Sequence, residues 1–352
     1  TTKSDTVEAN EQGYGSTGLN YTGEARDPKA GDMLTNMARI TAELGMEWRN
    51  FGLVASANYQ YDNEVMKDDA AVDVFGARTE SSQAAKDYAG NTFSVLDAYA
   101  YGAFDLGENP LEVRVGKQVI NWGEGLFFLN GIATQVPLDF NKATTPGTDL
   151  KEVYIGNPAI YASIGLGEES SIEAYYQYGW NRTELAPMDT FWGSEALGRG
   201  GDEANAFGIP ARGEDIISGD KDKGQYGLAF MSVIGEVEYG AFYSRYHETL
   251  PMLALDPDED YSCDIFGDGS FPNCSSVFGL SQTWAEDQDM IGLSMATTVG
   301  DWSVAAEASY RPDQAIWGDI IVKQYVNPDL TGPDANTNIE RHDTVHASVN
   351  GI

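Results

Sequence analysis

The sequence has few basic residues, almost no cysteine and no long apolar run, and each shortage excludes a class of protein. Only 21 Lys and Arg stand against 55 Asp and Glu, which gives a net charge of −34. A phosphate backbone would be repelled by this charge, so nucleic acid is not expected as a partner. No uninterrupted apolar stretch reaches the roughly 18 residues that a transmembrane helix needs. A helical membrane protein is therefore excluded.

The two cysteines, Cys263 and Cys274, lie close together in the sequence. A neighbouring pair in a chain otherwise free of cysteine predicts a disulfide formed in an oxidising compartment. A zinc site would need more Cys or His nearby, so the disulfide is the preferred interpretation.

The same stretch, residues 247–288, is strongly acidic, and we expect it to form an extracellular loop. Its carboxylates indicate a solvated, self-repelling surface. A second interpretation is a calcium site at Asp256, Asp258 and Asp260, because carboxylate oxygens are calcium's preferred ligands. The spacing does not match an EF-hand, and no other cofactor is expected.

Catalytic motifs are missing as well. The three histidines are isolated, with no Ser-His-Asp ordering and no zinc-ligand spacing. We therefore predict no catalytic residues and expect that the protein is not an enzyme.

Apolar and polar residues alternate in runs of about ten residues, as in strands with one apolar and one polar face. Tight turns at 49–50, 107–110, 167–170, 234–235 and 300–301 alternate with long loops at 62–91, 119–156, 181–223, 247–288 and 312–342. Aromatic residues stand at the ends of several apolar faces, as at a membrane interface: Trp48, Tyr61, Trp180, Trp302 and Tyr310. This pattern predicts an all-β fold, an antiparallel up-and-down transmembrane β-barrel with short periplasmic turns and long extracellular loops.

The whole chain, 1–352, is expected to form this one barrel domain. Ten strands and the start of an eleventh, near Asp343, can be followed. The loop lengths make the first of them run inward, which predicts that an earlier strand and the closing strands belong to a longer protein.

One long connection, 119–156, is too apolar for a loop exposed only to water. We call it the hatch segment and expect it to fold inward into the lumen, where Leu126, Phe127, Phe128 and Ile132 would be buried. Thr148–Glu152 predicts a short helix there. The segment either fills the lumen as an inert plug or gates the passage of an apolar solute.

The run Gly116–Glu124, with Pro137–Asp139 and Pro146–Glu152 after it, resembles the DUF1302 family of Gram-negative outer-membrane proteins. The resemblance is most specific over 111–182 and looser over the rest of the chain. It implies an outer-membrane location, contact with outer-membrane lipids and uptake of hydrophobic small molecules such as alkanes, long-chain lipids or sterols. It also implies a DUF1329-type periplasmic partner and an inner-membrane transporter of the RND type.

We therefore expect an outer-membrane uptake channel in which a hydrophobic small molecule passes a lumenal hatch. The alternatives are a general water-filled porin and a structural or surface-assembly protein. The residues expected along the substrate path are Asn121, Trp122, Gly123, Glu124, Phe127, Phe128, Asp139 and Pro146.

Overall fold

The computed structural model describes residues 33–68, 71–72, 78–125, 131–187, 190–193, 205–206, 209–215, 223–256, 279–317 and 339–351. These residues form an all-β fold in which consecutive long strands pair side by side in an antiparallel sheet. The predicted fold class, an antiparallel up-and-down arrangement, is confirmed. Among the described residues, no helix is long and apolar enough to cross a bilayer.

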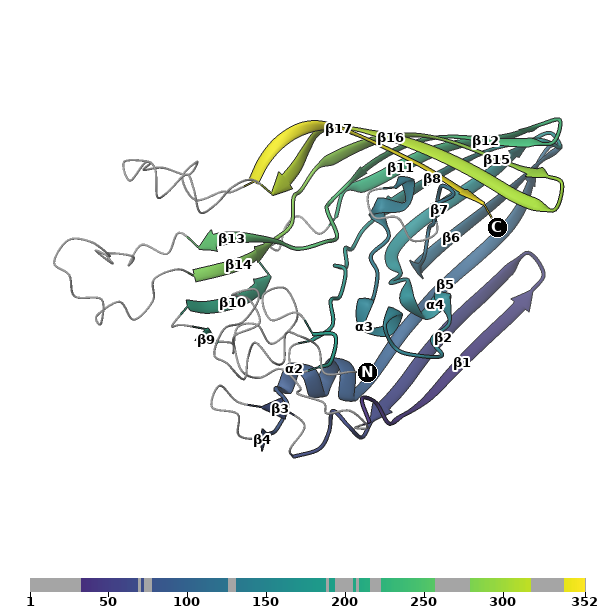
Figure 1. The fold of residues 1–352 in the computed structure, drawn as a ribbon. Coiled ribbons are helices and arrows are strands. Elements are labelled where there is room, and N and C mark those ends of the chain that lie inside the picture. The colour runs from purple at the N-terminus through teal and green to yellow at the C-terminus, as the bar shows by residue number, and fades with distance from the viewer. Residues whose placement is uncertain are drawn as a thin grey trace.

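Eleven strands make up the main sheet, and each is hydrogen-bonded to the next along the sheet. They are β1 (Met37–Trp48), β2 (Phe51–Asp62), β5 (Asn91–Leu106), β6 (Asn109–Gln118), β7 (Asn157–Leu166), β8 (Ser170–Gln177), β11 (Gln225–Ile234), β12 (Val237–Tyr246), β15 (Gln288–Val299), β16 (Trp302–Trp317) and β17 (Ile339–Gly351). Within the described part of the chain β1 pairs only with β2 and β17 only with β16, so the sheet is open between these edges. It curves around the hatch segment, as Figure 1 shows.

The two faces of the sheet differ as the alternation predicts. Along β2, exposed Leu53 and Tyr59 alternate with buried Ser56, Asn58 and Gln60. The apolar set therefore lies on the outer face and the polar set on the inner face. Four of the aromatic residues expected at the strand ends, Trp48, Tyr61, Trp302 and Tyr310, are exposed.

Trp180 departs from that expectation. Its ring packs edge-on against Trp284, with the centroids 5.6 Å apart, and its indole nitrogen is buried. The residue follows the end of β8, where the chain has left the outer face.

Tight turns join the strands at one end of the sheet and the long connections leave from the other (Figure 1). The turns lie where the sequence predicts them, with small shifts: Ile234 belongs to β11, and β17 begins at Ile339 rather than near Asp343. Gly107, Gly167, Gly235 and Gly300 supply the left-handed conformation in four turns, and Arg49 adopts it in the fifth, at φ 55°.

The long connections contain elements that the sequence pattern does not predict. They are β3 (Ala71–Val72), β4 (Arg78–Thr79), α2 (Gln83–Ala85), the π-helical turn η1 (Lys86–Gly90), β9 (Asn205–Ala206), β10 (Ile209–Asp215), β13 (Met252–Asp256) and β14 (Gly279–Thr283). The connections expected as loops at 181–223 and 247–288 contain strands as well, because β13, β14, β10 and β9 form a second, four-stranded sheet. In it, β10 and β14 come from different connections and pair in parallel.

The hatch segment lies between β6 and β7, and its described residues include three short helices. They are the 3₁₀ helix η2 (Ile132–Gln135), α3 (Phe140–Ala143) and α4 (Leu150–Val153). The predicted short helix is thus α4, with Asp149 at its N-cap, although no side-chain hydrogen bond closes that cap. The segment returns to the wall at Asn157, so it crosses the concave side of the sheet between two neighbouring strands.

Candidate functional site: the hatch and its anchors

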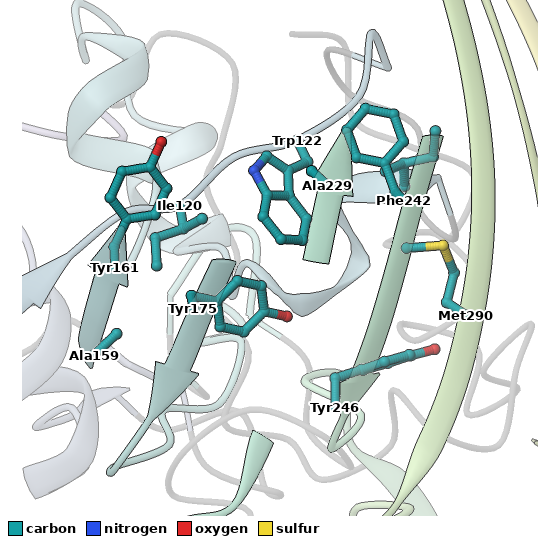
Figure 2. Close-up of a cluster of buried hydrophobic side chains, with 10 residues drawn as sticks. Ile120, Trp122, Ala159, Tyr161, Tyr175, Ala229, Phe242, Tyr246 and Met290 are labelled. Carbon is teal, nitrogen blue, oxygen red and sulfur yellow. The ribbon is translucent and has the colours of Figure 1, made fainter. Parts of the chain in front are cut away.

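An apolar cluster fastens the first part of the hatch segment to the wall. Trp122 is buried, and its ring centroid lies 4.9 Å from that of Tyr175 and 5.9 Å from that of Phe242. Figure 2 shows the indole between these two rings, with Met290 on the far side of Phe242. Ile132 from η2 is also fully buried in this cluster. Burial of a Trp side chain in such a cluster contributes about 3 kcal/mol or more to stability, judged from Trp-to-Ala losses in protein cores.

A carboxylate on the inner face of β16 holds the hatch backbone. Glu307 accepts hydrogen bonds from the backbone N–H groups of Glu124 (2.8 Å), Gly125 (3.0 Å) and Ile132 (3.2 Å). Three converging N–H donors are a strong arrangement for a buried carboxylate, because hydrogen bonds to a charged acceptor are worth more than neutral ones. Glu307 is 7% exposed, so water competes little for these donors.

We call Glu307 and the three N–H groups that donate to it the Glu307 cradle. Gly123 gives this cradle its shape. Its φ of +87° lies in the left-handed region, which glycine adopts at little cost. A Cβ at this position would stand 2.6 Å from Oε2 of Glu307 and 2.7 Å from Cβ of Ile132. The Gly-Glu-Gly sequence therefore lets the backbone approach the carboxylate closely enough for its N–H groups to donate.

Arg311 lies on the same inner face of β16 as Glu307. It binds the hatch segment at Gly131, directly before η2. Its Nη2 donates to the carbonyl oxygen of Gly131 at 2.6 Å, and its Nε donates to Tyr246 Oη at 3.1 Å. The side chain is fully buried. A further tie comes from β17, where Asn350 Nδ2 donates to the carbonyl oxygen of Glu124 at 2.6 Å.

The far end of the hatch segment is fixed to β1 and β2 through a different carboxylate. Glu152 of α4 is buried and accepts from Arg39 Nη1 at 3.1 Å, from Asn58 Nδ2 at 3.2 Å and from Thr41 Oγ1. Next to it, the exposed Lys151 forms an ion pair with Glu43. The hatch segment thus bridges the concave side of the sheet, from its first strands to its last.

The structure brings only some of the predicted path residues together. Gly123 and Glu124 meet at the Glu307 cradle, and Trp122 beside them packs in the apolar cluster. Burial raises the pKa of Glu124, with Glu238 and Glu307 adding to the rise. Asp139 lies apart, where it caps α3 and pairs with Lys142; burial raises the pKa of Asp139 against the opposing effect of this lysine.

The remaining predicted residues do not converge on that cradle. Asn121 and Pro146 are exposed. Phe127 and Phe128 lie outside the described residues, as do Cys263, Cys274, Asp258 and Asp260; Asp256 ends β13, and its side chain is not described. Among the residues that the structure describes, no group of three or more His, Cys, Asp or Glu could hold a metal ion.

Sequence reasoning missed the anchors themselves. Glu173, which accepts from Trp122 Nε1 at 2.8 Å, and Glu307 both look like residues that line a wet lumen. The signal present in the sequence is the charged pair Glu307 and Arg311, four residues apart on one strand face. Their partners, however, lie about 180 residues earlier in the chain.

Comparison with known proteins identifies a family and a similar solved structure. A family model described as "Protein of unknown function (DUF1302)" matches residues 2–352. A search of curated proteins found no match. Among solved structures, the siderophore receptor PirA from Pseudomonas aeruginosa is similar at 12% identity and a TM-score of 0.27, over 78% of this chain and 42% of the receptor chain. The chain thus spans less than half the length of that receptor.

Proposed function

The chain belongs to the DUF1302 family, and from that membership and its geometry we propose that it is an outer-membrane uptake channel for hydrophobic small molecules. The proposed substrates are of the alkane, long-chain lipid or sterol class. They enter from the end that carries the long connections, which faces the cell exterior, and pass the hatch without an energy source in the channel itself.

The observation that carries the membrane part of the proposal is the outer face of the sheet. Large apolar side chains on it are exposed from β1 to β17, for example Ile40, Leu44, Leu293, Val345 and Val349. A water-soluble protein rarely exposes so continuous an apolar surface, whereas a barrel wall in lipid requires one.

The hatch supports the transport part. It closes the concave side of the sheet through a small number of polar anchors at Glu307, Arg311 and Glu152 and one apolar cluster around Trp122. A segment held this way can swing aside as a unit when one set of anchors is released, and the apolar cluster then offers a surface along which a greasy solute moves. This arrangement favours a gated path over a wide, water-filled pore.

Partners on the inner side follow from the family resemblance. A solute released into the periplasm needs a carrier, for which we propose a DUF1329-type periplasmic protein, and an RND-type transporter in the inner membrane. No catalytic role is proposed.

The test uses purified protein in liposomes. We expect uptake of a labelled alkane or sterol into the vesicles, with little conductance of small ions. A variant carrying Lys151→Cys and Glu43→Cys, joined by a short bis-maleimide, ties α4 to β1 through two exposed positions. This link is expected to slow uptake, and the same variant without the linker serves as control. Free passage of ions together with no uptake of the apolar probe would replace this proposal with a general porin.

A further inference from the structure

A cavity lies away from the Glu307 cradle, where the long connections meet the wall. It has a volume of about 320 Å³, at the small end of the range for ligand pockets. Three separate parts of the chain line it: η1 with the start of β5, the start of α3 in the hatch, and the segment that follows β8. Because α3 of the hatch segment forms part of this pocket, a solute bound there contacts the hatch segment directly.

Hydrogen bonds between these three parts hold the pocket open in one shape. Asn141 Nδ2 donates to the carbonyl oxygen of Tyr88 at 3.2 Å, which joins α3 to η1. The backbone N–H of Phe140 donates to the carbonyl oxygen of Glu184 at 2.8 Å, which joins α3 to the segment after β8. The walls are therefore preformed, and a ligand would lose less free energy in ordering them.

The lining combines an apolar side with an acidic one. Leu185 and Pro187 supply apolar surface, and Tyr88 and Phe93 border the pocket. Phe93 is also exposed, and it lies opposite the exposed Tyr59 in the neighbouring strand β2. Two exposed aromatic residues at this level of the wall are what a membrane–water interface requires, so the pocket lies beside the lipid boundary.

Among the residues that the structure describes, the lining holds three carboxylates, Asp87, Asp139 and Glu184, and no cation. Each carboxylate already has a partner outside the lining: Gln83 donates to Asp87 at 2.7 Å, and Lys142 and Arg182 pair with Asp139 and Glu184 at 3.4 Å each. Carboxylates accept hydrogen bonds and do not donate them when ionised. A ligand with a hydroxyl or ammonium group meets acceptors here, whereas a carboxylate group meets like charge.

We propose that this pocket is the capture site for the transported molecule, and that it selects an apolar body carrying a hydroxyl or ammonium group over one carrying a carboxylate. The proposal rests on the proposed uptake function and narrows its substrate class. Among lipids it favours alcohols, sterols and amines and disfavours free fatty acids.

The test compares three probes with one carbon skeleton: para-fluorinated 4-phenylbutan-1-ol, 4-phenylbutylamine and 4-phenylbutyrate. Binding to the full chain in nanodiscs is followed by ¹⁹F NMR, with empty nanodiscs to measure partition into lipid. We expect the alcohol and the amine to bind at least about tenfold more tightly than the acid, which corresponds to about 1.4 kcal/mol. Equal affinity for the acid and the alcohol would overturn the proposal.

Variants assign the binding to this pocket. Leu185→Trp fills the cavity and is expected to remove binding of all probes, while Asp87→Asn should weaken the amine and leave the alcohol unchanged. Glu108→Gln, in an exposed tight turn at the opposite end of the sheet, is the matched control. Probe binding that survives Leu185→Trp would overturn the pocket assignment.

The two proposals fail separately. Probe binding without uptake into liposomes rejects the transport function and keeps the pocket. Uptake that continues at full rate in the Leu185→Trp variant rejects the pocket as the capture site and keeps the transport function.

Discussion

Glu307 accepts hydrogen bonds from three backbone N–H groups of the hatch segment. Replacing it by Ala leaves three hydrogen-bond donors without their acceptor in a site that water enters poorly. We expect Glu307→Ala to reduce the protection of the Glu124, Gly125 and Ile132 amides in hydrogen exchange by about 100-fold, which corresponds to about 3 kcal/mol. Glu307→Gln keeps one acceptor oxygen and should lose less.

Glu236→Gln is the control for this pair of variants, because Glu236 is exposed in a tight turn. Unchanged protection in Glu307→Ala would mean that the apolar cluster and the other polar anchors hold the hatch without Glu307.

Alanine variants at Gly123 and Gly147 distinguish the cost of a left-handed backbone conformation from the cost of a close contact. Gly123→Ala and Gly147→Ala both place a side chain at positive φ, at +87° and +77°. Only at Gly123 would the new Cβ meet other atoms within 4 Å. We expect Gly147→Ala to lower the free energy of unfolding by about 1 kcal/mol and Gly123→Ala to lower it further, as measured by thermal unfolding in detergent. Equal losses in the two variants would show that the contact with Glu307 contributes nothing.

Glu124 makes the cradle sensitive to pH. Its pKa is raised by burial and by two neighbouring carboxylates, so the folded state binds its proton more tightly than the unfolded state does. The penalty for ionised Glu124 is therefore full above its folded pKa and is relieved as the pH falls through that value toward the ordinary 4.5. We expect Glu124→Gln to raise the thermal midpoint at neutral pH and to make no difference at low pH. A larger gain at low pH than at neutral pH would contradict this assignment.

At the scale of the elements, α4 depends on one buried charge network. Glu152→Ala would leave Arg39, 15% exposed at its side chain, without its carboxylate. Loss of one partner of such a pair costs about 3 kcal/mol, whereas Lys151→Met, which breaks the exposed pair with Glu43, should cost less than about 1 kcal/mol.

A double-mutant cycle isolates the pair. The double variant Arg39→Ala and Glu152→Ala is expected to lose less stability than the two single variants lose in sum. Hydrogen exchange of the amides at positions 152 and 153 is the readout. Strict additivity would show that Arg39 and Glu152 do not act together.

The spanning strands could be predicted from the sequence, because the period of two is written locally in each run, as in Leu53, Ala55 and Tyr59 of β2. The second sheet could not, since β10 and β14 are short and pair across two separate connections. The anchoring residues could not be predicted for a related reason. A carboxylate on a polar strand face has the same local pattern whether it faces water or, as Glu307 does, a backbone segment from a distant part of the chain.

At the scale of the whole molecule, the outer face decides whether the sheet sits in lipid. Leu293, in the middle of β15, and Ile234, at the turn end of β11, are similarly exposed, at 62% and 66%. In a bilayer, Leu293→Arg should cost about 2–4 kcal/mol of folding free energy and Ile234→Arg about 1 kcal/mol or less, because the cost depends on depth. Folding into lipid vesicles, followed by the shift in electrophoretic mobility of unheated samples, measures the difference. Equal costs at the two sites would contradict the membrane placement.

The long reach of the anchors also sets an order of events during biogenesis. Glu124 leaves the ribosome well before Glu307 and Asn350, which follow it by 183 and 226 residues. Contacts of such separation are made late, after loop closure has been achieved by the intervening strands. The Glu307 and Asn350 anchors therefore form only when β16 and β17 join the sheet, whereas the partners of Trp122 and Glu152 lie on earlier strands.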